Sequence, residues 1–154
     1  MIEEGQMAPD VKLQLSDESE ASLSAYRGKP LILYFYPKDD TPGCTKEAIA
    51  FTDLVGEFAK AGVTIIGVSK DPPAKHVKFA AKHELKVTLA TDADGSVTEG
   101  FGVWVEKNMY GRKYMGIQRA TFLIDSDGKV AKVWPKVKVA GHAEAVLEDV
   151  KALG

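Results

Sequence analysis

The fold of this chain is decided by one segment, residues 34–47, which reads YFYPKDDTPGCTKE. The segment joins a continuous apolar run, residues 31–36, to the start of a helical pattern. An uninterrupted apolar run of this length is typical of a central strand covered on both faces, and the prolines of the following loop end the strand. Beyond the loop, apolar residues recur at steps of three and four: Ala48, Phe51, Val55 and Phe58. We therefore predict a strand followed by an amphipathic helix over residues 44–60.

The chain contains a single cysteine, Cys44, which falls in the first turn of the predicted helix, directly after Gly43. The start of a helix carries unpaired backbone N–H groups and a partial positive charge, and both favour an anion over a neutral thiol. The reactive form of cysteine is the thiolate, which such a position promotes when a cation is also near. The sequence therefore predicts a nucleophilic thiolate. The competing interpretation is a small buried hydrophobic residue, the commoner fate of a free cysteine.

Strands and helices alternate through the rest of the chain. We predict strands at 11–15, 63–68, 87–91, 121–124 and 130–134, a short segment near 21–23 that completes an N-terminal hairpin, and a helix at 73–83. A closing helix is marked by Ala143, Val146, Leu147, Val150 and Leu153. Residues 92–95 and 125–128 have turn composition, whereas residues 106–118 lack clear periodicity and are predicted to form a loop beside the site.

The composition favours one ordinary globular domain over residues 1–154. Hydrophobic residues make up 45% of the chain, charged residues 27%, and the net charge is −2. This balance gives no reason to expect nucleic-acid binding, and no run approaches the length of a membrane-spanning helix. The acidic start of the sequence differs from a secretory signal, so we expect a reducing, cytoplasmic setting. A single cysteine also excludes an intramolecular disulfide and a C-x-x-C redox pair.

The spacing of Pro37, Thr41 and Cys44 spells P-x-x-x-T-x-x-C, and the longer run over residues 34–47 resembles the peroxiredoxins, specifically their Q-type branch, also called bacterioferritin comigratory proteins. Nearly the whole chain follows the layout of this branch. The resemblance implies an α/β thioredoxin-like fold with an N-terminal β-hairpin extension and a mixed central sheet flanked by helices. It also implies a thiol-dependent peroxidase that acts on hydrogen peroxide and small organic hydroperoxides, with neither a metal nor an organic cofactor.

The resemblance assigns roles to five residues. Cys44 is the nucleophile that becomes a sulfenic acid, and Thr41 holds a peroxide oxygen by hydrogen bonding. Arg119, just before the strand at 120–124, is a permanent cation beside the thiolate. Glu47 orients this arginine, and Pro37 shapes the loop and shields one wall of the pocket. Without the resemblance, Thr41 reads as a turn residue, Arg119 as a solvated charge at a strand end, and Glu47 as a first-turn acid.

The sequence departs from the branch in its cysteines. Many members carry a second, resolving cysteine five residues after the first, where this chain has Ile49, and others carry it in the next helix, around Ala80 and Ala81. The sequence fits a chain that naturally lacks this cysteine equally well as one in which it was replaced. Either way, an external thiol is expected to act as reductant: thioredoxin, glutaredoxin, glutathione or another chain. Relatives include monomers and dimers, and both states stay open.

Two other functions use the same cysteine differently. A non-enzymatic peroxide sensor or redox-regulated binding protein would pass the oxidation of Cys44 to a partner, and a structural or chaperone-like domain would keep the thiol inert. The three histidines, His76, His83 and His142, lack the ligand spacing of a metal site. Trp104, Tyr110 and Met115 are candidates either for a pocket wall that accepts organic hydroperoxides or for ordinary packing.

Overall fold

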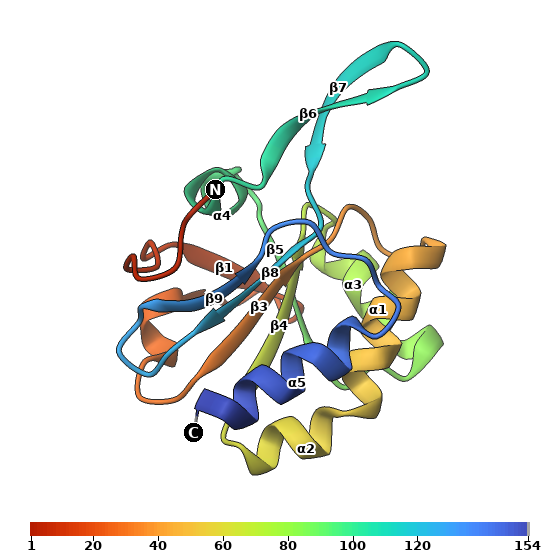
Figure 1. Cartoon of the computed structure of the whole chain (residues 1–154). Coiled ribbons are helices and arrows are strands. Elements are labelled where there is room, and N and C mark those ends of the chain that lie inside the picture. The colour runs from red at the N-terminus through yellow and green to blue at the C-terminus, as the bar shows by residue number, and fades with distance from the viewer. Residues whose placement is uncertain (154) are drawn as a thin grey trace.

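The computed structural model describes residues 1–153 and is built around a mixed sheet of seven strands (Figure 1). The strand order is β2–β1–β5–β4–β3–β8–β9. Strands β3, β4 and β5 are parallel, whereas β1 and β8 join this group in antiparallel fashion. The mixed sheet with an N-terminal hairpin, β1–β2, is confirmed. The strand bounds are Lys12–Leu15 (β1), Glu20–Ser22 (β2), Leu31–Phe35 (β3), Thr64–Ser69 (β4), Thr88–Thr91 (β5), Ala120–Ile124 (β8) and Val130–Trp134 (β9).

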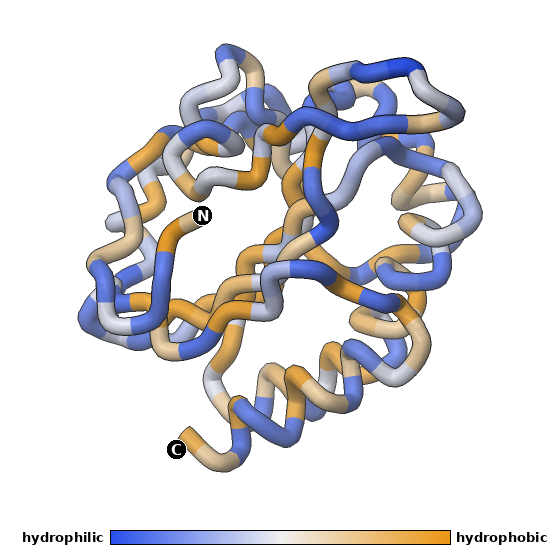
Figure 2. Tube along the Cα trace, turned by 45° about the horizontal axis from the view of Figure 1, so that its top comes forward, coloured by the Kyte–Doolittle hydropathy of each residue, from blue (hydrophilic) through white to orange (hydrophobic). Residues whose placement is uncertain are grey.

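Helices cover the two faces of the sheet unequally. One face packs against the apolar sides of α1, α2, α3 and α5, and the other packs against α4 and the N-terminal segment (Figure 1). Apolar residues concentrate along the inner strands, with polar residues on the outer turns (Figure 2). The helix bounds are Pro42–Asp53 (α1), Val55–Lys60 (α2), Pro73–His83 (α3), Ser96–Phe101 (α4) and His142–Leu153 (α5), with a 3₁₀ turn, η1, at Leu23–Tyr26. Within residues 1–153, no helix combines the length and apolarity needed to cross a membrane.

The alternation of side chains along β3 and the residue after it sends Tyr34 and Tyr36 toward the helix-rich face. Leu33 and Phe35 belong to the core under α4, whereas Tyr34 and Tyr36 belong to the core under α1. In the same way, β8 places Thr121 against His142 of α5. Arg119 lies one alternation before Thr121, so its side chain leaves the strand on the α1 side. Strand geometry therefore brings Arg119 to Cys44 at the start of α1, although the two residues lie 75 positions apart in the sequence.

Three structural predictions were wrong. The helix expected at 44–60 begins at Pro42 and is interrupted at Leu54, because the Leu54 N–H bonds to the Phe51 carbonyl three residues back and tightens the turn. Residues 106–118 are not a loop: β6 (Trp104–Met109) and β7 (Arg112–Ile117) form a hairpin that projects from the body (Figure 1). Leu153 is 47% exposed rather than buried, since Val150 is the last side chain of α5 that reaches the core.

Candidate active site

Cys44 lies in the first turn of α1, as the sequence predicts, although the helix starts two residues earlier. Thr41 is the N-cap residue, with extended backbone angles (φ −96°, ψ 156°), and Pro42 is the first helical residue. The first backbone hydrogen bond of the helix runs from the Thr45 N–H to the Thr41 carbonyl at 2.9 Å. The N–H groups of Gly43 and Cys44 precede this bond and therefore remain available to an anion at the helix start.

Arg119 lies directly beside the sulfur of Cys44. Its Nη2 donates to the Cys44 Sγ at 3.3 Å, and its Nη1 donates to the Glu47 Oε1 at 2.7 Å. Cys44 is only 2% exposed, whereas the Arg119 side chain keeps 18% of its surface. The guanidinium thus contacts both the thiol and solvent. A permanent cation and the start of a helix therefore both lie beside the sulfur.

Glu47 is a buried carboxylate that is only half satisfied. Its side chain is 1% exposed, and its Oε2 has no hydrogen-bond partner. Burial raises the pKa of Glu47 to about 7, although the attraction and hydrogen bond of Arg119 act in the opposite direction. Burial also disfavours the charge of Arg119, but Glu47 and Cys44 more than offset this and raise the arginine's pKa. The guanidinium therefore stays charged and is shared between the Cys44 sulfur and the Glu47 carboxyl group.

Gly43 gives the guanidinium its room. A Cβ at this position would lie 3.1 Å from the Arg119 Nη2. Because the same nitrogen donates to Cys44 and its neighbour donates to Glu47, a methyl group here would have to push the guanidinium away from at least one of them. Gly43 thus favours the close approach of Arg119, and its backbone angle is not one that needs glycine.

The two loop residues of the motif lie nearer to solvent. The Thr41 side chain is partly exposed and donates its hydroxyl proton to the Lys38 carbonyl at 2.9 Å. Its oxygen lone pairs remain free to accept a hydrogen bond. Pro37 is exposed where the chain leaves β3, and its role as a pocket wall stays a prediction. The structure therefore brings Cys44, Arg119 and Glu47 into contact and places Thr41 at the helix start beside them.

Two residues near the site carried no signal in the sequence. The Tyr34 hydroxyl is buried without a partner, and the ring stacks on Phe51 at a centroid distance of 4.8 Å. The ring also covers Gly67 of β4, where a Cβ would lie 2.5 Å from it. Lys107 of β6 is partly buried; burial and the charge of Arg119 lower its pKa, while Cys44 acts in the opposite direction. Long-range contacts of this kind follow from the register of the sheet and the hairpin.

The predicted pocket wall does not form from Trp104, Tyr110 and Met115 together. Trp104 packs on the apolar core with the Lys70 ammonium 4.5 Å from its ring centroid. Tyr110 is fully exposed in the hairpin turn, and Met115 is half exposed. Because the hairpin projects outward, these three side chains point to different surroundings rather than to one cavity.

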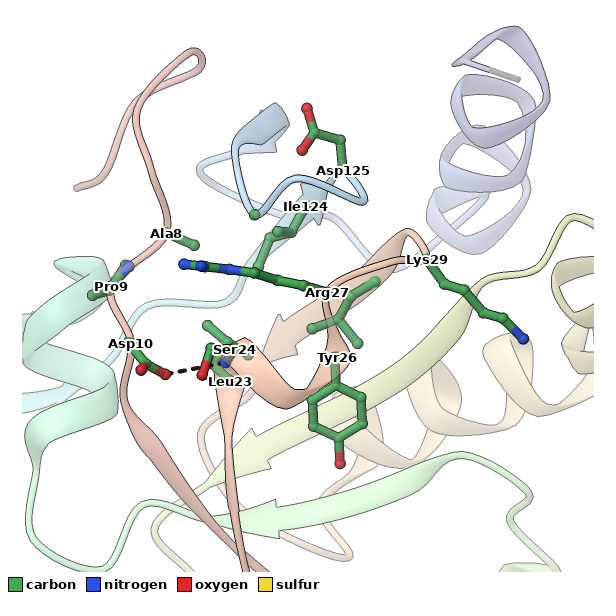
Figure 3. Close-up of a pocket in the computed structure, with 12 residues that line it drawn as sticks. Ala8, Pro9, Asp10, Leu23, Ser24, Tyr26, Arg27, Lys29, Ile124 and Asp125 are labelled. Carbon is green, nitrogen blue, oxygen red and sulfur yellow. Dashed lines mark hydrogen bonds between the residues drawn. The ribbon is translucent and has the colours of Figure 1, made fainter.

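Other parts of the described chain have weaker features of a functional site. Among residues 1–153, no group of three or more His, Cys, Asp or Glu side chains has the arrangement of a metal site. A pocket beside Leu31 and Arg27, at the amino end of β3 and therefore away from Cys44, is shown in Figure 3. Its cavity volume is about 10 Å³, which suffices for about one water molecule. The start of α1 is therefore the site with the strongest chemical features.

Comparison with known proteins agrees with this geometry. A family model described as the AhpC/TSA family matches residues 4–133. The chain is 51% identical to the putative peroxiredoxin bcp of Coxiella burnetii over 146 residues, which cover 95% of this chain and 97% of the relative. It is 48% identical to peroxiredoxin Bcp of Bacillus subtilis, with 97% and 96% covered. The chain belongs to the Q-type peroxiredoxins.

Solved structures place this peroxiredoxin in the same group. A peroxiredoxin Q structure from Xanthomonas campestris has a TM-score of 0.88 at 48% identity and covers 92% of this chain and 90% of its own. A second Xanthomonas campestris structure, of a bacterioferritin comigratory protein studied for alkyl peroxide reduction, has a TM-score of 0.91 at 45% identity, with 97% and 98% covered. The thioredoxin-like fold and a thiol-dependent peroxidase activity follow, and a purely non-enzymatic sensor is not favoured.

Proposed function

We propose that this peroxiredoxin reduces hydrogen peroxide and small organic hydroperoxides at Cys44. The observation that carries the proposal is the contact of Arg119 with the Cys44 Sγ at 3.3 Å, held by the bond of the same guanidinium to Glu47 at 2.7 Å. A thiolate is the nucleophile that a peroxide oxygen requires, and a fixed cation beside it stabilises charge that moves to the departing oxygen. The alkyl peroxide reduction named for the Xanthomonas campestris relative supports the inclusion of organic hydroperoxides.

The reaction consists of one attack and one bond cleavage. The Cys44 thiolate attacks the terminal oxygen of the hydroperoxide, an S–O bond forms, and the O–O bond breaks. The electron pair of that bond leaves with the distal oxygen, which takes a proton from solvent and departs as water or an alcohol. Cys44 is thereby oxidised to a sulfenic acid, which keeps the transferred hydroxyl group.

Thr41, Arg119 and Glu47 have distinct roles in this proposal. The Thr41 hydroxyl donates to the Lys38 carbonyl, so it accepts a hydrogen bond from the peroxide O–H and orients it. Arg119 stabilises both the thiolate and the oxygen that gains charge, together with the free N–H groups of α1. Glu47 holds the guanidinium in place through Nη1. Pro37 lies two residues after β3, and its fixed φ angle shapes the loop.

We further propose that an external thiol completes the cycle, because the chain has one cysteine. A first thiol displaces water from the sulfenic acid and forms a mixed disulfide, and a second thiolate releases Cys44 with a disulfide of the reductant. Thioredoxin, glutaredoxin and glutathione are the candidate classes. A need for external thiols fits a reducing, cytoplasmic setting. In this proposal residues 1–154 form one domain, and the protein is a monomer or a homodimer.

A peroxide titration followed by intact-mass measurement tests the proposal. We expect one added oxygen per chain at one equivalent of peroxide, located at Cys44, and its removal by at least one of the three thiol classes with catalytic turnover. A protein that stops after one equivalent, whichever reductant is present, would be a sensor. An unmodified chain would contradict the assignment of Cys44.

A further inference from the structure

A chain of hydrogen bonds between buried side chains anchors the loop of residues 38–41, which leads into α1. The Tyr36 hydroxyl donates to the Asp39 Oδ1 at 2.5 Å, the Asp39 Oδ2 lies 2.6 Å from the His76 Nδ1, and the His76 Nε2 lies 3.0 Å from the Ala90 carbonyl. His76 is 0% exposed, Tyr36 1% and Asp39 2%. The proposed reaction uses none of these groups, although Asp39 lies only two residues before Thr41.

The geometry fixes where the protons lie. A carbonyl oxygen only accepts, so the His76 Nε2 must carry the hydrogen that bonds to Ala90. The Nδ1 then faces a carboxyl oxygen at 2.6 Å, and one further proton must lie between these two atoms, since two lone pairs at this distance would repel. Burial raises the pKa of Tyr36, so its phenol stays protonated and donates. Both nitrogens of the His76 ring and both oxygens of Asp39 are therefore engaged.

This chain of bonds holds a loop with an unusual backbone angle. Asp40, the next residue, has a φ of 60°, in the left-handed region, which aspartate adopts more readily than most residues other than glycine. Asp39 is fixed by three bonds, because its backbone N–H also donates to the Asp71 Oδ2 at 2.8 Å. Thr41 follows two residues after Asp39, at the start of α1.

The loop is also attached to α3 through Asp40, and this contact is weaker than the one between Asp39 and His76. Asp40 accepts from the Lys82 Nζ at 2.8 Å and pairs with the His83 Nε2 at 2.9 Å, both on α3. The Lys82 side chain is 62% exposed and Asp40 is 38% exposed, so this contact is screened by water. The buried contact between Asp39 and His76 is therefore the one that fixes the loop against α3.

We propose that His76 is a positioning residue for the peroxidase reaction: through Asp39 it holds residues 38–41 so that the Thr41 hydroxyl meets a peroxide bound at Cys44. His76 touches no substrate and acts through the loop alone. The inference rests on the proposed roles of Cys44 and Thr41, and it adds a determinant of their geometry on a different helix.

Two substitutions at the same position separate positioning from packing. In His76→Asn, the amide nitrogen takes the place of Nδ1 and keeps the bond to Asp39; in His76→Gln, it takes the place of Nε2 and keeps the bond to Ala90 instead. Both are neutral, and both leave one bond of the original two. We expect the second-order rate of Cys44 oxidation by hydrogen peroxide to fall about tenfold in His76→Gln and to stay within about threefold of the unsubstituted protein in His76→Asn.

The readouts are stopped-flow oxidation by peroxide and, in parallel, alkylation of Cys44 by iodoacetamide. Positioning predicts that alkylation does not slow in His76→Gln, because the thiolate itself is unchanged. Equal oxidation rates in the Asn and Gln variants, or a parallel fall in alkylation, would overturn the inference. Lys82→Ala is the matched control for the exposed attachment and should change oxidation less than twofold.

A third variant tests the positioning role of the hydrogen-bonded chain if His76→Gln does not fold. Tyr36→Phe keeps the ring and removes the hydrogen bond to the Asp39 Oδ1 together with the longer contact, 3.4 Å, to the His76 Nδ1. It should slow oxidation by about threefold without slowing alkylation. An unchanged oxidation rate in Tyr36→Phe would then refute the role of the chain. Failure of the proposed function would look different, because the unsubstituted protein would itself show no oxidation of Cys44.

Discussion

Two helix starts in this molecule are built in opposite ways. At the start of α4, the buried carboxylate of Asp92 accepts from the backbone N–H groups of Gly95, Val97 and Thr98 and from the Thr98 hydroxyl. At the start of α1, no side chain caps the helix, and the Arg119 guanidinium donates to the sulfur of Cys44 in its first turn. A structural helix start satisfies its donors from within the chain, whereas a reactive one keeps them for an anion that arrives later.

The buried carboxyl groups near these two helix starts also differ in how fully they are hydrogen-bonded. Asp92 has both oxygens engaged, but Glu47 leaves its Oε2 without a partner although it is 1% exposed. A buried unpaired polar atom costs about 1–3 kcal/mol. The unpaired oxygen of Glu47 thus lowers the stability of the fold at the start of α1, whereas Asp92 causes no such loss at the start of α4. Five substitutions test this contrast, in order of their expected effect on the oxidation of Cys44.

Cys44→Ser should have the largest effect, because it removes the nucleophile from the reactive helix start. We expect a loss of peroxidase turnover of at least about 10³-fold with a folded protein. Peroxide consumption in the presence of an active reductant measures it, and the circular dichroism spectrum checks the fold. Full activity in the serine variant would place the chemistry elsewhere.

Arg119→Ala should lower the second-order rate of Cys44 oxidation by about 10²-fold, since one charged donor to the sulfur and the departing oxygen is lost. Arg119→Lys keeps the charge but cannot donate to Cys44 and Glu47 at once through a planar group. Its oxidation rate should therefore lie between those of Arg119→Ala and the unsubstituted protein. Stopped-flow oxidation provides the rates. Equal rates in the lysine variant and the unsubstituted protein would reduce the role of Arg119 to its charge.

Gly43→Ala should lower the same rate by about tenfold, because the added methyl group displaces the guanidinium from the sulfur. Gly56→Ala is the matched control: it also lies in a helix, and its Cβ would meet nothing within 4 Å. The control should leave the oxidation rate unchanged and stabilise the fold by about 0.5–1 kcal/mol. A slow control would mean that helix rigidity, and not the position of Arg119, sets the rate.

Glu47→Gln should change the pH dependence of stability more than the rate. Because the folded-state pKa of Glu47 is raised from 4.5 to about 7, the folded state keeps a proton that the unfolded chain loses, and stability falls as the pH rises through this window. The loss is about 3 kcal/mol between these limits. Urea unfolding at pH 5 and pH 8, in a Cys44→Ser background, should show a smaller pH difference after the substitution. An unchanged difference would mean that Glu47 is ionised throughout.

Asp92→Asn should have the smallest effect on oxidation, within about twofold, although it weakens the satisfied helix start by about 1–3 kcal/mol. Its thermal unfolding should therefore shift while its stopped-flow rate does not. A large fall in rate would show that the two helix starts are coupled and would end the contrast drawn above.

The sequence was informative wherever a local pattern or a long motif carried the chemistry. The apolar run before Pro37 predicted β3, and the resemblance led to Arg119, which the alternation of β8 then brings to Cys44. The hairpin of β6 and β7 was missed because it projects from the body and most of its residues are exposed or only partly buried, so they need not alternate. Its turn also has Tyr110 in a left-handed conformation, where asparagine or aspartate before the glycine would have been the usual signal.

Contacts across the sheet were beyond prediction for a different reason. Asp39 and His76 lie 37 residues apart and meet only because β3 and β4 are parallel neighbours with α3 packed over them. The break at Leu54 has no proline in the helix interior to announce it. Such features depend on tertiary packing, which a single sequence does not show.

The ring of Tyr34 over Gly67 limits how this protein can change over evolutionary time. A side chain at position 67 would collide with the ring 2.5 Å away, while the ring is held in place by its stack on Phe51. A mutation to a larger residue at 67 is therefore tolerated only after position 34 has become smaller. The two positions are expected to vary together among descendants of this sequence, in that order.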